Sequence, residues 1–423
     1  MWSRVSGLVV ALMGCSLVNA PSGFQDGDAG SAADSEPARD GSDGSDVPDG
    51  AADAEVQDGG PTDAAGDVAV DAGRADAGPE GWRILQIEAG RAHACVRLEG
   101  GRVVCWGSND QGQLGHATDG PDFVDTALRF GSIAVEENVT CGVTFTLEAY
   151  CWGQVDSNPP PLAGLFFRVG EAVQSVSIGN LRDTTLTVIC TENQGAVDCY
   201  VSTALQAPGG LNGLFGDSWA PPGMDIVKLS VGRDHFVFET GGVVRSFGND
   251  VFGQQGDASR GTGVVLIPEG AEGRIVEELA ADSNRSCAST GTSVWCWGQA
   301  GFPNADGSDA IRSSPVDLLI AGPILDLDLA PSFGCAAAGD GVQCWGLNPD
   351  TTDGIPPSSP VPPIDAGGPG TRLVATGSGF ACNVSGRIAT RCWGANDSGQ
   401  LGGAPGPSGA ASNILSLLLG TAS

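Results

Sequence analysis

The feature that most constrains the fold is a short motif, Cys-Trp-Gly, which returns along the chain at an almost constant interval. Five complete copies and two degraded copies begin at residues 105, 151, 199, 246, 296, 344 and 392. Successive copies are 46 to 50 residues apart. Seven occurrences at such a period are typical of a repeat protein in which each repeat forms one supersecondary unit.

Each repeat contains the same succession of short apolar segments. A first strand such as 84–87, 226–229, 275–279 or 324–327 is followed by a hairpin that ends in the Cys-Trp-Gly motif. A glycine-rich loop and a last short strand, such as 315–320, complete the repeat. Four short strands at a period near 48 residues match one blade of a β-propeller.

Residues 413–419 supply the expected last strand of the seventh repeat, and no partial repeat is left over. A closed ring would protect the strand edges that an open stack of repeats would expose. The sequence therefore predicts an all-β, seven-bladed β-propeller with four-stranded blades over residues 84–420.

The glycine-rich loops carry a more specific signature. Trp106–Gly115 and Trp393–Gly402 share the pattern Trp-Gly-x-Asn-Asp-x-Gly-Gln-Leu-Gly, and Phe247–Gly256 is a weaker copy. This pattern resembles the repeat of the regulator of chromosome condensation family. The resemblance implies the propeller fold. It says little about function, because members of the family range from a nuclear exchange factor for a small GTPase to a secreted inhibitor of β-lactamases.

Twelve of the 13 cysteines fall into six pairs, each of which flanks one hairpin. The remaining hairpin has Val237 and Ser246 at the matching places, so both members of that pair are absent together, as a disulfide predicts. Separations of 9 and 10 residues place the two cysteines opposite each other across two- and three-residue turns, within bridging distance. The predicted disulfides are Cys95–Cys105, Cys141–Cys151, Cys190–Cys199, Cys287–Cys296, Cys335–Cys344 and Cys382–Cys392.

These disulfides imply an oxidising compartment, and the amino terminus is consistent with export. Residues 1–20 are expected to form a signal peptide, because Arg4 precedes an apolar segment that is too short to span a membrane. Leu12-Met13-Gly14-Cys15 resembles the lipobox of bacterial lipoproteins, which implies cleavage before Cys15 and lipidation of that cysteine. The rival interpretation is ordinary cleavage after Ala20 and secretion of a soluble protein.

Residues 21–80 are predicted to be a disordered tether. They contain 16 acidic and 2 basic residues and are otherwise mostly Ala, Gly, Ser and Pro. Such a segment buries too little apolar surface to offset the entropy of ordering it. The acidic run at 40–46 lacks the closing glutamate of a calcium loop, so a solvated spacer is the favoured interpretation.

The remaining charge pattern excludes some functions. The formal net charge is −31, and Lys228 is the only lysine, so the chain is not expected to bind nucleic acid. We find no motif for a catalytic nucleophile, a phosphate-binding loop or a metal site, and we expect no cofactor. His93 and His235 occupy the same repeat position, which favours packing or hydrogen bonding over catalysis, whereas His116 lies in a loop.

Two features depart from the repeat and are candidates for partner contact. Trp219 lies in a loop outside the Cys-Trp-Gly pattern, where an exposed tryptophan would suit a binding hot spot and a buried one would form a satellite core. The proline-rich segment 348–363 is either a contact loop or a divergent part of the repeat. The Trp-Gly tryptophans themselves are expected to pack between blades.

The sequence thus favours a monomeric, non-enzymatic binding scaffold that contacts a membrane only through its lipid. It would be displayed on the bacterial outer membrane or cell surface, and its partner would be a protein or a surface polymer. An alternative is an enzyme that acts on polysaccharide at the mouth of the propeller channel, which would need converging carboxylates. Regulation of a small GTPase is a third possibility, which the family resemblance alone suggests.

Overall fold

The structure is a computed structural model that describes residues 82–118, 120–155, 166–180, 187–201, 225–257, 265, 276–299, 311–320, 322–339, 341–346, 370–412 and 414. All of them belong to one compact unit, Ala69–Ser423. Cys15, the expected signal peptide and the tether lie outside the described residues. Within these ranges no helix is long and apolar enough to cross a membrane.

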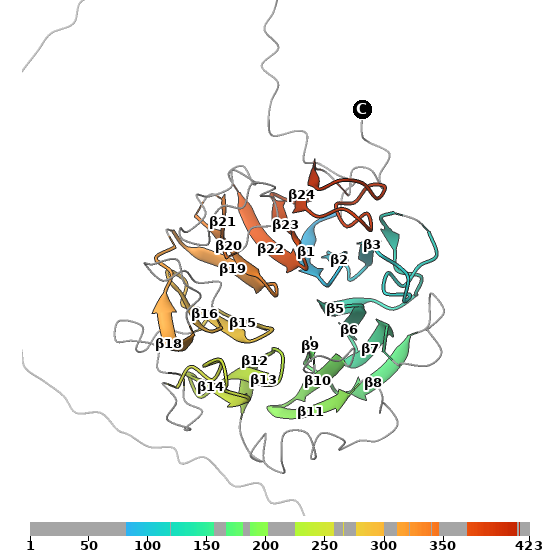
Figure 1. Ribbon diagram of the computed structural model, residues 1–423. Helices are drawn as coiled ribbons and strands as arrows, with labels where there is room; N and C mark the ends of the chain where they lie inside the picture. The colour runs from blue at the N-terminus through green and yellow to red at the C-terminus, as the bar shows by residue number, and fades with distance from the viewer. Residues whose placement is uncertain are drawn as a thin grey trace, which may run out of the picture. The chain divides into compact units, whose positions relative to one another are not determined.

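The described residues form seven antiparallel sheets arranged around a common axis (Figure 1). The first sheet contains β1 (Ile84–Ala89), β2 (His93–Leu98), β3 (Val103–Gly107) and β4 (Asp122–Phe123). The second contains β5 (Phe130–Glu136), β6 (Val139–Thr144), β7 (Glu148–Gly153) and β8 (Phe167–Glu171). The third contains β9 (Ser175–Asn180), β10 (Thr187–Asn193) and β11 (Ala196–Val201).

The other four sheets contain β12 (Ile226–Val231), β13 (His235–Thr240) and β14 (Val243–Gly248); β15 (Glu278–Asp282), β16 (Arg285–Ser289), β17 (Val294–Gly298) and β18 (Arg312–Asp317); β19 (Ile324–Leu329), β20 (Phe333–Ala338) and β21 (Gly341–Gly346); and β22 (Thr371–Gly377), β23 (Phe380–Ser385), β24 (Ala389–Gly394) and β25 (Gly409–Ser412). The predicted all-β, seven-bladed propeller is confirmed. Three of its blades have three described strands and the other four have four.

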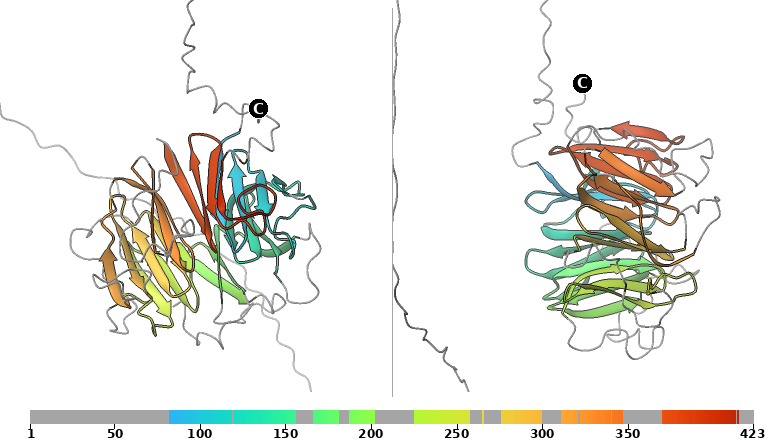
Figure 2. Two further views of the ribbon diagram at one scale, coloured as in Figure 1. Left: turned by 45° about the horizontal axis from the view of Figure 1, so that its top comes forward. Right: turned by 90° about the vertical axis from the view of Figure 1, so that its left-hand side faces the viewer.

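The first strand of each sheet lies nearest the axis (Figure 1). Each sheet packs face to face against the next (Figure 2). The core is therefore divided into clusters between adjacent blades. The predicted role of the motif tryptophans is confirmed, because Trp106, Trp152, Trp297 and Trp393 are almost fully buried there. A large ring at a fixed place in each blade fills the space that the twist of adjacent sheets leaves open.

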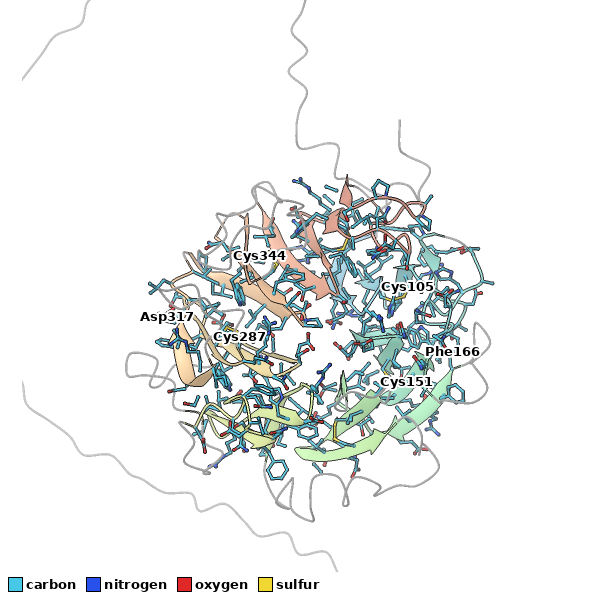
Figure 3. The ribbon with its side chains drawn as sticks, in the orientation of Figure 1. Cys105, Cys151, Phe166, Cys287, Asp317 and Cys344 are labelled. Carbon is cyan, nitrogen blue, oxygen red and sulfur yellow. A yellow bond between two sulfur atoms is a disulfide. The ribbon has the colours of Figure 1, made fainter. Side chains whose placement is uncertain are left out.

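All six predicted cysteine pairs are disulfide-bonded within their hairpins. In every pair the two cysteines are directly opposed across neighbouring strands, as their separations of 9 and 10 residues predict, and their Cα atoms are 4.0 to 4.1 Å apart. Val237 pairs with Ser246 at the matching place of the fourth blade. Figure 3 shows Cys105, Cys151, Cys287 and Cys344 within the blades, away from the axis.

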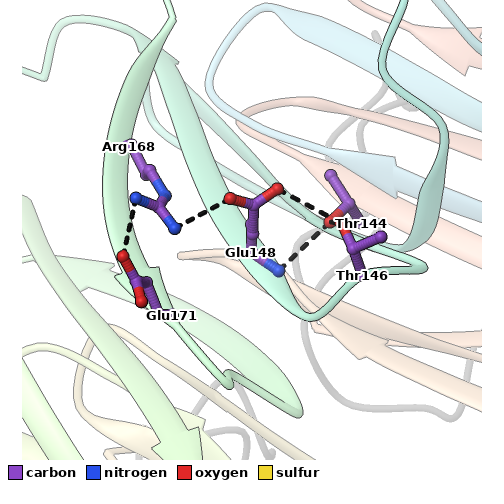
Figure 4. Close-up of polar contacts among 5 residues, drawn as sticks. All are labelled: Thr144, Thr146, Glu148, Arg168 and Glu171. Carbon is purple, nitrogen blue, oxygen red and sulfur yellow. Dashed lines mark hydrogen bonds and ion pairs between the residues drawn. The ribbon is translucent and has the colours of Figure 1, made fainter.

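Ion pairs help to fix the outer strand of the second blade. In the second blade, Arg168 on β8 forms ion pairs with Glu148 and Glu171, each with an N–O distance of 2.7 Å. Thr144 and Thr146 at the adjacent hairpin turn hydrogen-bond to Glu148 (Figure 4). These charges are partly exposed, so they contribute little to stability and mainly orient β8.

Three strand boundaries differ from the sequence prediction. The last strand of the seventh blade is β25, not residues 413–419; of those residues only Ile414 is described, and it is buried in the core cluster between the first and last blades. Likewise β18 spans 312–317 instead of 315–320, and β15 spans 278–282 instead of 275–279. In each case the run of apolar residues does not predict the ends of the strand. Hydrogen-bonded pairing with the neighbouring strand sets these ends, and it can include small or polar residues.

Within the described residues, the strands of each sheet are consecutive in the chain, and no strand is exchanged between the first and last blades. The ring closes through packing of β1 to β3 against β22 to β24. Three hydrogen bonds among the described residues cross this seam. Ile84 N donates to Arg387 O over 2.8 Å, Trp106 Nε1 donates to Gln400 O over 3.0 Å, and the guanidinium of Arg372 donates to Ile84 O.

Candidate functional site

The innermost strands of all seven blades line a central channel. Its cavity has a volume of about 380 Å³. Alternate residues of an inner strand face the axis, and at these positions the channel collects carboxylates from four different blades. The acidic residues that line it are Glu88, Glu136, Glu278, Asp326 and Asp328.

Burial changes the protonation of these carboxyl groups. Burial raises the pKa of Asp326 and of Asp328 from 3.8 to about 7, partly offset by hydrogen bonds from backbone N–H groups. Burial, and then the charge of Asp328, raises the pKa of Glu88 well above its usual range. Burial also raises the pKa of Glu278, and the neighbouring Lys228 opposes that rise. The channel therefore carries less negative charge at neutral pH than its composition suggests.

The two channel aspartates are bound to the next blade. Asp326 Oδ2 accepts a hydrogen bond from the backbone N–H of Val374 over 2.8 Å. Asp328 Oδ2 accepts from the N–H of Thr376 over 2.6 Å and from its hydroxyl over 3.1 Å. The inner strand of a blade has one edge that is not paired with another strand, and these side chains accept hydrogen bonds from backbone N–H groups along that edge.

The same arrangement occurs elsewhere in the channel with neutral side chains. Gln86 accepts from the N–H of Ile133 and donates to its carbonyl oxygen, at 3.0 and 2.7 Å. Ser230 Oγ accepts from the N–H of Ala281 over 2.8 Å. A polar residue on one inner strand thus caps the edge of the next. Sequence reasoning missed these residues; the signal that could have found them is a polar side chain recurring on the first strand of successive repeats.

His93 and His235 serve as links between blades. His93 Nε2 lies 2.9 Å from Thr140 Oγ1, and His235 Nε2 lies 2.8 Å from Ser286 Oγ, in both cases on the following blade. Both rings are fully buried. Burial lowers the pKa of His93 to about 3 and that of His235 to about 4, so both are neutral near pH 7. The predicted packing and hydrogen-bonding role is confirmed.

His116 is also buried, and it belongs to the structure of the first signature loop. Its Nε2 lies 3.0 Å from the carbonyl oxygen of Cys105, and its Nδ1 lies 3.1 Å from the hydroxyl oxygen of Thr118. The ring therefore connects the loop to β3, and each of its two nitrogens lies within hydrogen-bonding distance of a neighbouring oxygen.

The signature loops share one internal hydrogen bond, from a backbone N–H to a side-chain oxygen five residues earlier, which we call the brace. Asn109 Oδ1 accepts from the N–H of Leu114 over 3.0 Å, and Asn396 Oδ1 accepts from the N–H of Leu401 over 3.1 Å. In the fourth blade, Asp250 takes the same place. The asparagine of the motif, or the aspartate that replaces it in the fourth blade, is thus a structural residue that fixes the path of the loop.

Each braced loop covers the motif tryptophan of the next blade. Trp297 Nε1 donates to Gln254 O over 2.9 Å, as Trp106 does to Gln400 across the seam. The loop approaches closely because of its last glycine: a Cβ on Gly256 would lie 2.5 Å from a ring carbon of Trp297. The signature therefore encodes a contact between blades.

The two complete signature loops belong to the first and last blades, and together they form a second, larger cavity. This seam cleft has a volume of about 900 Å³ and lies beside the ring closure. Exposed Asp110 and Asp397, at equivalent positions of the two loops, contribute to its walls. Its other lining residues are Gly107, Ser108, Asn109, Leu114, Thr118, Gly120, Pro121, Ser398, Gly399, Gly402, Gly403, Ala404 and Pro405.

Trp219 and segment 348–363 lie outside the described residues. Trp295 is partly buried on β17, and its indole nitrogen has no hydrogen-bond partner in the described part of the chain. In that same part, no group of three or more His, Cys, Asp or Glu side chains is placed to hold a metal ion.

Comparison with known proteins supports the repeat and the fold. Residues 84–113, which span β1 to β3 and the start of the first signature loop, match the regulator of chromosome condensation (RCC1) repeat. The ultraviolet-B receptor UVR8 of Arabidopsis thaliana is 36% identical over 83 residues, which cover 18% of this chain and 18% of the receptor.

Among solved structures, Prp20p of Saccharomyces cerevisiae superposes with a TM-score of 0.53 at 17% identity, over 72% of this chain and 83% of that one. Yeast RCC1 (Prp20) in its complex with Kap60 gives 0.51 at 17% identity, over 71% and 80%. At this identity the likeness concerns the fold alone. The chain thus contains an RCC1 repeat at residues 84–113 within a seven-bladed β-propeller whose structural neighbours include yeast RCC1.

Proposed function

We propose that this protein is a non-enzymatic binding scaffold that presents its propeller to a protein partner at the bacterial envelope or cell surface. The observation that carries the proposal is the seam cleft. Its volume of about 900 Å³ is in the range of specific binding sites, and it is open between two loops that are braced before any partner arrives. Preformed walls lower the entropic cost of association.

The rest of the ring supports a rigid recognition surface. Six disulfides tie the hairpins, and His93 and His235 link neighbouring blades. Proteins of similar fold are described as binding other proteins: Prp20p with Gsp1p and histones, and yeast RCC1 with Kap60. The fold is thus compatible with protein binding, although it does not specify a partner.

Display at the envelope is the second part of the proposal, and it is supported by the sequence. Residues 1–20 act as a signal peptide, Cys15 becomes lipidated, and residues 21–80 form a tether with a typical reach of roughly 40–45 Å. Mass spectrometry of the protein purified from its native membrane tests this. We expect a diacylated Cys15 as the first residue; an intact Met1 would remove both the anchor and the compartment.

The binding function is tested with the full-length protein and envelope extracts, with bound material identified by mass spectrometry. We expect saturable binding without chemical change in the partner. The double variant N109A/N396A removes the braces of both loops at the cleft and should weaken binding. D250A removes the equivalent brace from the fourth blade and serves as the matched control. Turnover of the bound material, or no saturable binding, would overturn the proposal.

A second candidate, an enzyme acting on polysaccharide in the channel, is favoured by one observation. Carboxyl groups from several blades converge there, and burial places the pKa of Asp326 and of Asp328 at about 7, where an acid could act. Against it, both carboxylates are bound to backbone N–H groups of β22. Incubation with envelope polysaccharides should show no product; product that disappears in D326N or D328N would establish the enzyme.

Regulation of a small GTPase is a third candidate, and it rests on the fold that the chain shares with yeast RCC1. Export and the disulfides argue against it, because small GTPases are cytosolic or nuclear. Nucleotide release from a panel of GTPases should be unchanged by the protein, and acceleration of any one of them would move this candidate to first place.

A further inference from the structure

We propose that the seam cleft recognises a cationic side chain, arginine or lysine, on a loop or chain end of the protein partner. This inference rests on the proposed function and specifies which face of the ring binds and what chemistry it binds. It starts from the place of the cleft. The two loops that form it belong to opposite ends of the propeller sequence, so the site exists only when the ring is closed.

The walls of the cleft are rigid and have few free backbone donors. In the first loop, the N–H of Gln111 donates to Gln113 Oε1 over 2.8 Å, and in the last loop the N–H of Ser398 donates to Gln400 Oε1 over 2.8 Å. The brace at Asn396 extends further, because its side-chain amide donates to Ala404 O over 3.0 Å. A ligand therefore meets side-chain acceptors and carbonyl oxygens more than N–H groups.

Charge decides which ligand suits such walls. The described lining contains two carboxylates, Asp110 and Asp397, and no cationic side chain. Among the described residues, Asp110 has one long contact of 3.5 Å with Ser108 Oγ, which leaves most of its carboxylate available to a partner. The molecule as a whole carries a formal charge of −31, which attracts cationic segments and repels acidic ones.

Comparison of the three signature loops separates this role from the loop's structural role. Asn109, Asn396 and Asp250 all brace their loops from within. The next position holds Asp110 and Asp397 in the loops that form the cleft, but Val251 in the fourth blade, where the side chain is 67% exposed. The carboxylate is thus not needed to build the loop, and it is present in both loops at the cleft.

A peptide-binding experiment tests the assignment. The probe is the fluorescein-labelled peptide Gly-Gly-Arg-Gly-Arg-Gly, and its matched neutral probe has citrulline in place of both arginines. Anisotropy is measured with the full-length protein at physiological ionic strength. We expect the arginine peptide to bind the wild type more tightly than the citrulline peptide. D110N/D397N should weaken arginine binding by about fivefold, the size that two exposed ion pairs give.

The control separates the cleft from the general field of an acidic protein. E99Q/D225N removes the same two charges from exposed positions that do not line the cleft, and it should leave the affinity within about twofold, because distant exposed charges are screened by salt. Equal weakening by the two double variants, or equal affinity for the two peptides, would overturn the inference.

Failure of this inference can be distinguished from failure of the proposed function. If envelope partners bind D110N/D397N as tightly as the wild type, protein binding stands and the assignment to the cleft fails. If the wild type captures no partner, the proposed function itself fails. Loss of partner capture in D110N/D397N, with capture retained by E99Q/D225N, supports both.

Discussion

The indole N–H of Trp106 donates a hydrogen bond to the carbonyl oxygen of Gln400, 3.0 Å away, although 294 residues separate the two. This contact spans the seam between the first and last blades. Among the described residues no strand is shared across that seam, and side-chain packing and a few such bonds join the two blades there.

Replacing Trp106 with Phe should destabilise the ring through loss of this bond. Trp393 is the control, because it is equally buried and its Nε1 has no hydrogen-bond partner among the described residues. Both W106F and W393F lose ring volume, but only W106F leaves a buried carbonyl unpaired. We expect W106F to cost about 1–2 kcal/mol more in urea unfolding. Equal losses would show that the bond contributes nothing.

Removal of one hairpin disulfide should lower stability without breaking the ring. The fourth blade provides the natural substitute, because Val237 pairs with Ser246 where other hairpins have a disulfide. We expect C287V/C296S to lose about 2–3 kcal/mol, the chain-entropy estimate for a short loop. Urea unfolding under non-reducing conditions measures this. A loss larger than about 5 kcal/mol would mean that the disulfide also organises the neighbouring blades.

The channel aspartates should make the protein less stable as pH rises. The pKa of Asp326 and of Asp328 is about 7 in the folded state and near 3.8 in the unfolded chain, so the folded state holds protons that the unfolded state has lost. Their stabilising contribution is complete below pH 4 and is lost as pH rises through 7. We expect D326N/D328N, measured by thermal unfolding at pH 5 and pH 8, to flatten this trend. An unchanged slope would contradict the assignment.

The lowered pKa of His93 should make the protein less stable as pH falls, which is the opposite of the effect of the channel aspartates. Its pKa falls from 6.5 to about 3 on folding, so below pH 6.5 the unfolded chain binds the extra proton and stability decreases as pH falls. Phe333 and Phe380 occupy the same register in the sixth and seventh blades, which makes H93F a conservative test. Relative to the wild type, H93F should lose less stability between pH 7 and pH 4.5. Parallel losses in both proteins would refute this.

The sequence by itself determined the features that are local to one repeat. Cys95 and Cys105 lie ten residues apart on one hairpin, so their spacing alone predicts that they face each other and form a disulfide. The period of the Cys-Trp-Gly motif predicts the number of blades for the same reason, because the described strands of each blade are consecutive in the chain. Segment 413–419 shows the limit of this reasoning, since ladder pairing placed the last strand at β25.

Only the tertiary structure decided what the repeats form together. In the sequence, nothing distinguishes Asp326 from the other 50 acidic residues. In the structure it lines the channel and accepts a hydrogen bond from the N–H of Val374, because the sixth and seventh blades lie side by side. Asp110 and Asp397 share a cleft because ring closure unites the two ends of the propeller. Convergence of this kind depends on the rotation between blades and on closure, which short-range periodicity does not encode, whereas hairpin register is set within about ten residues.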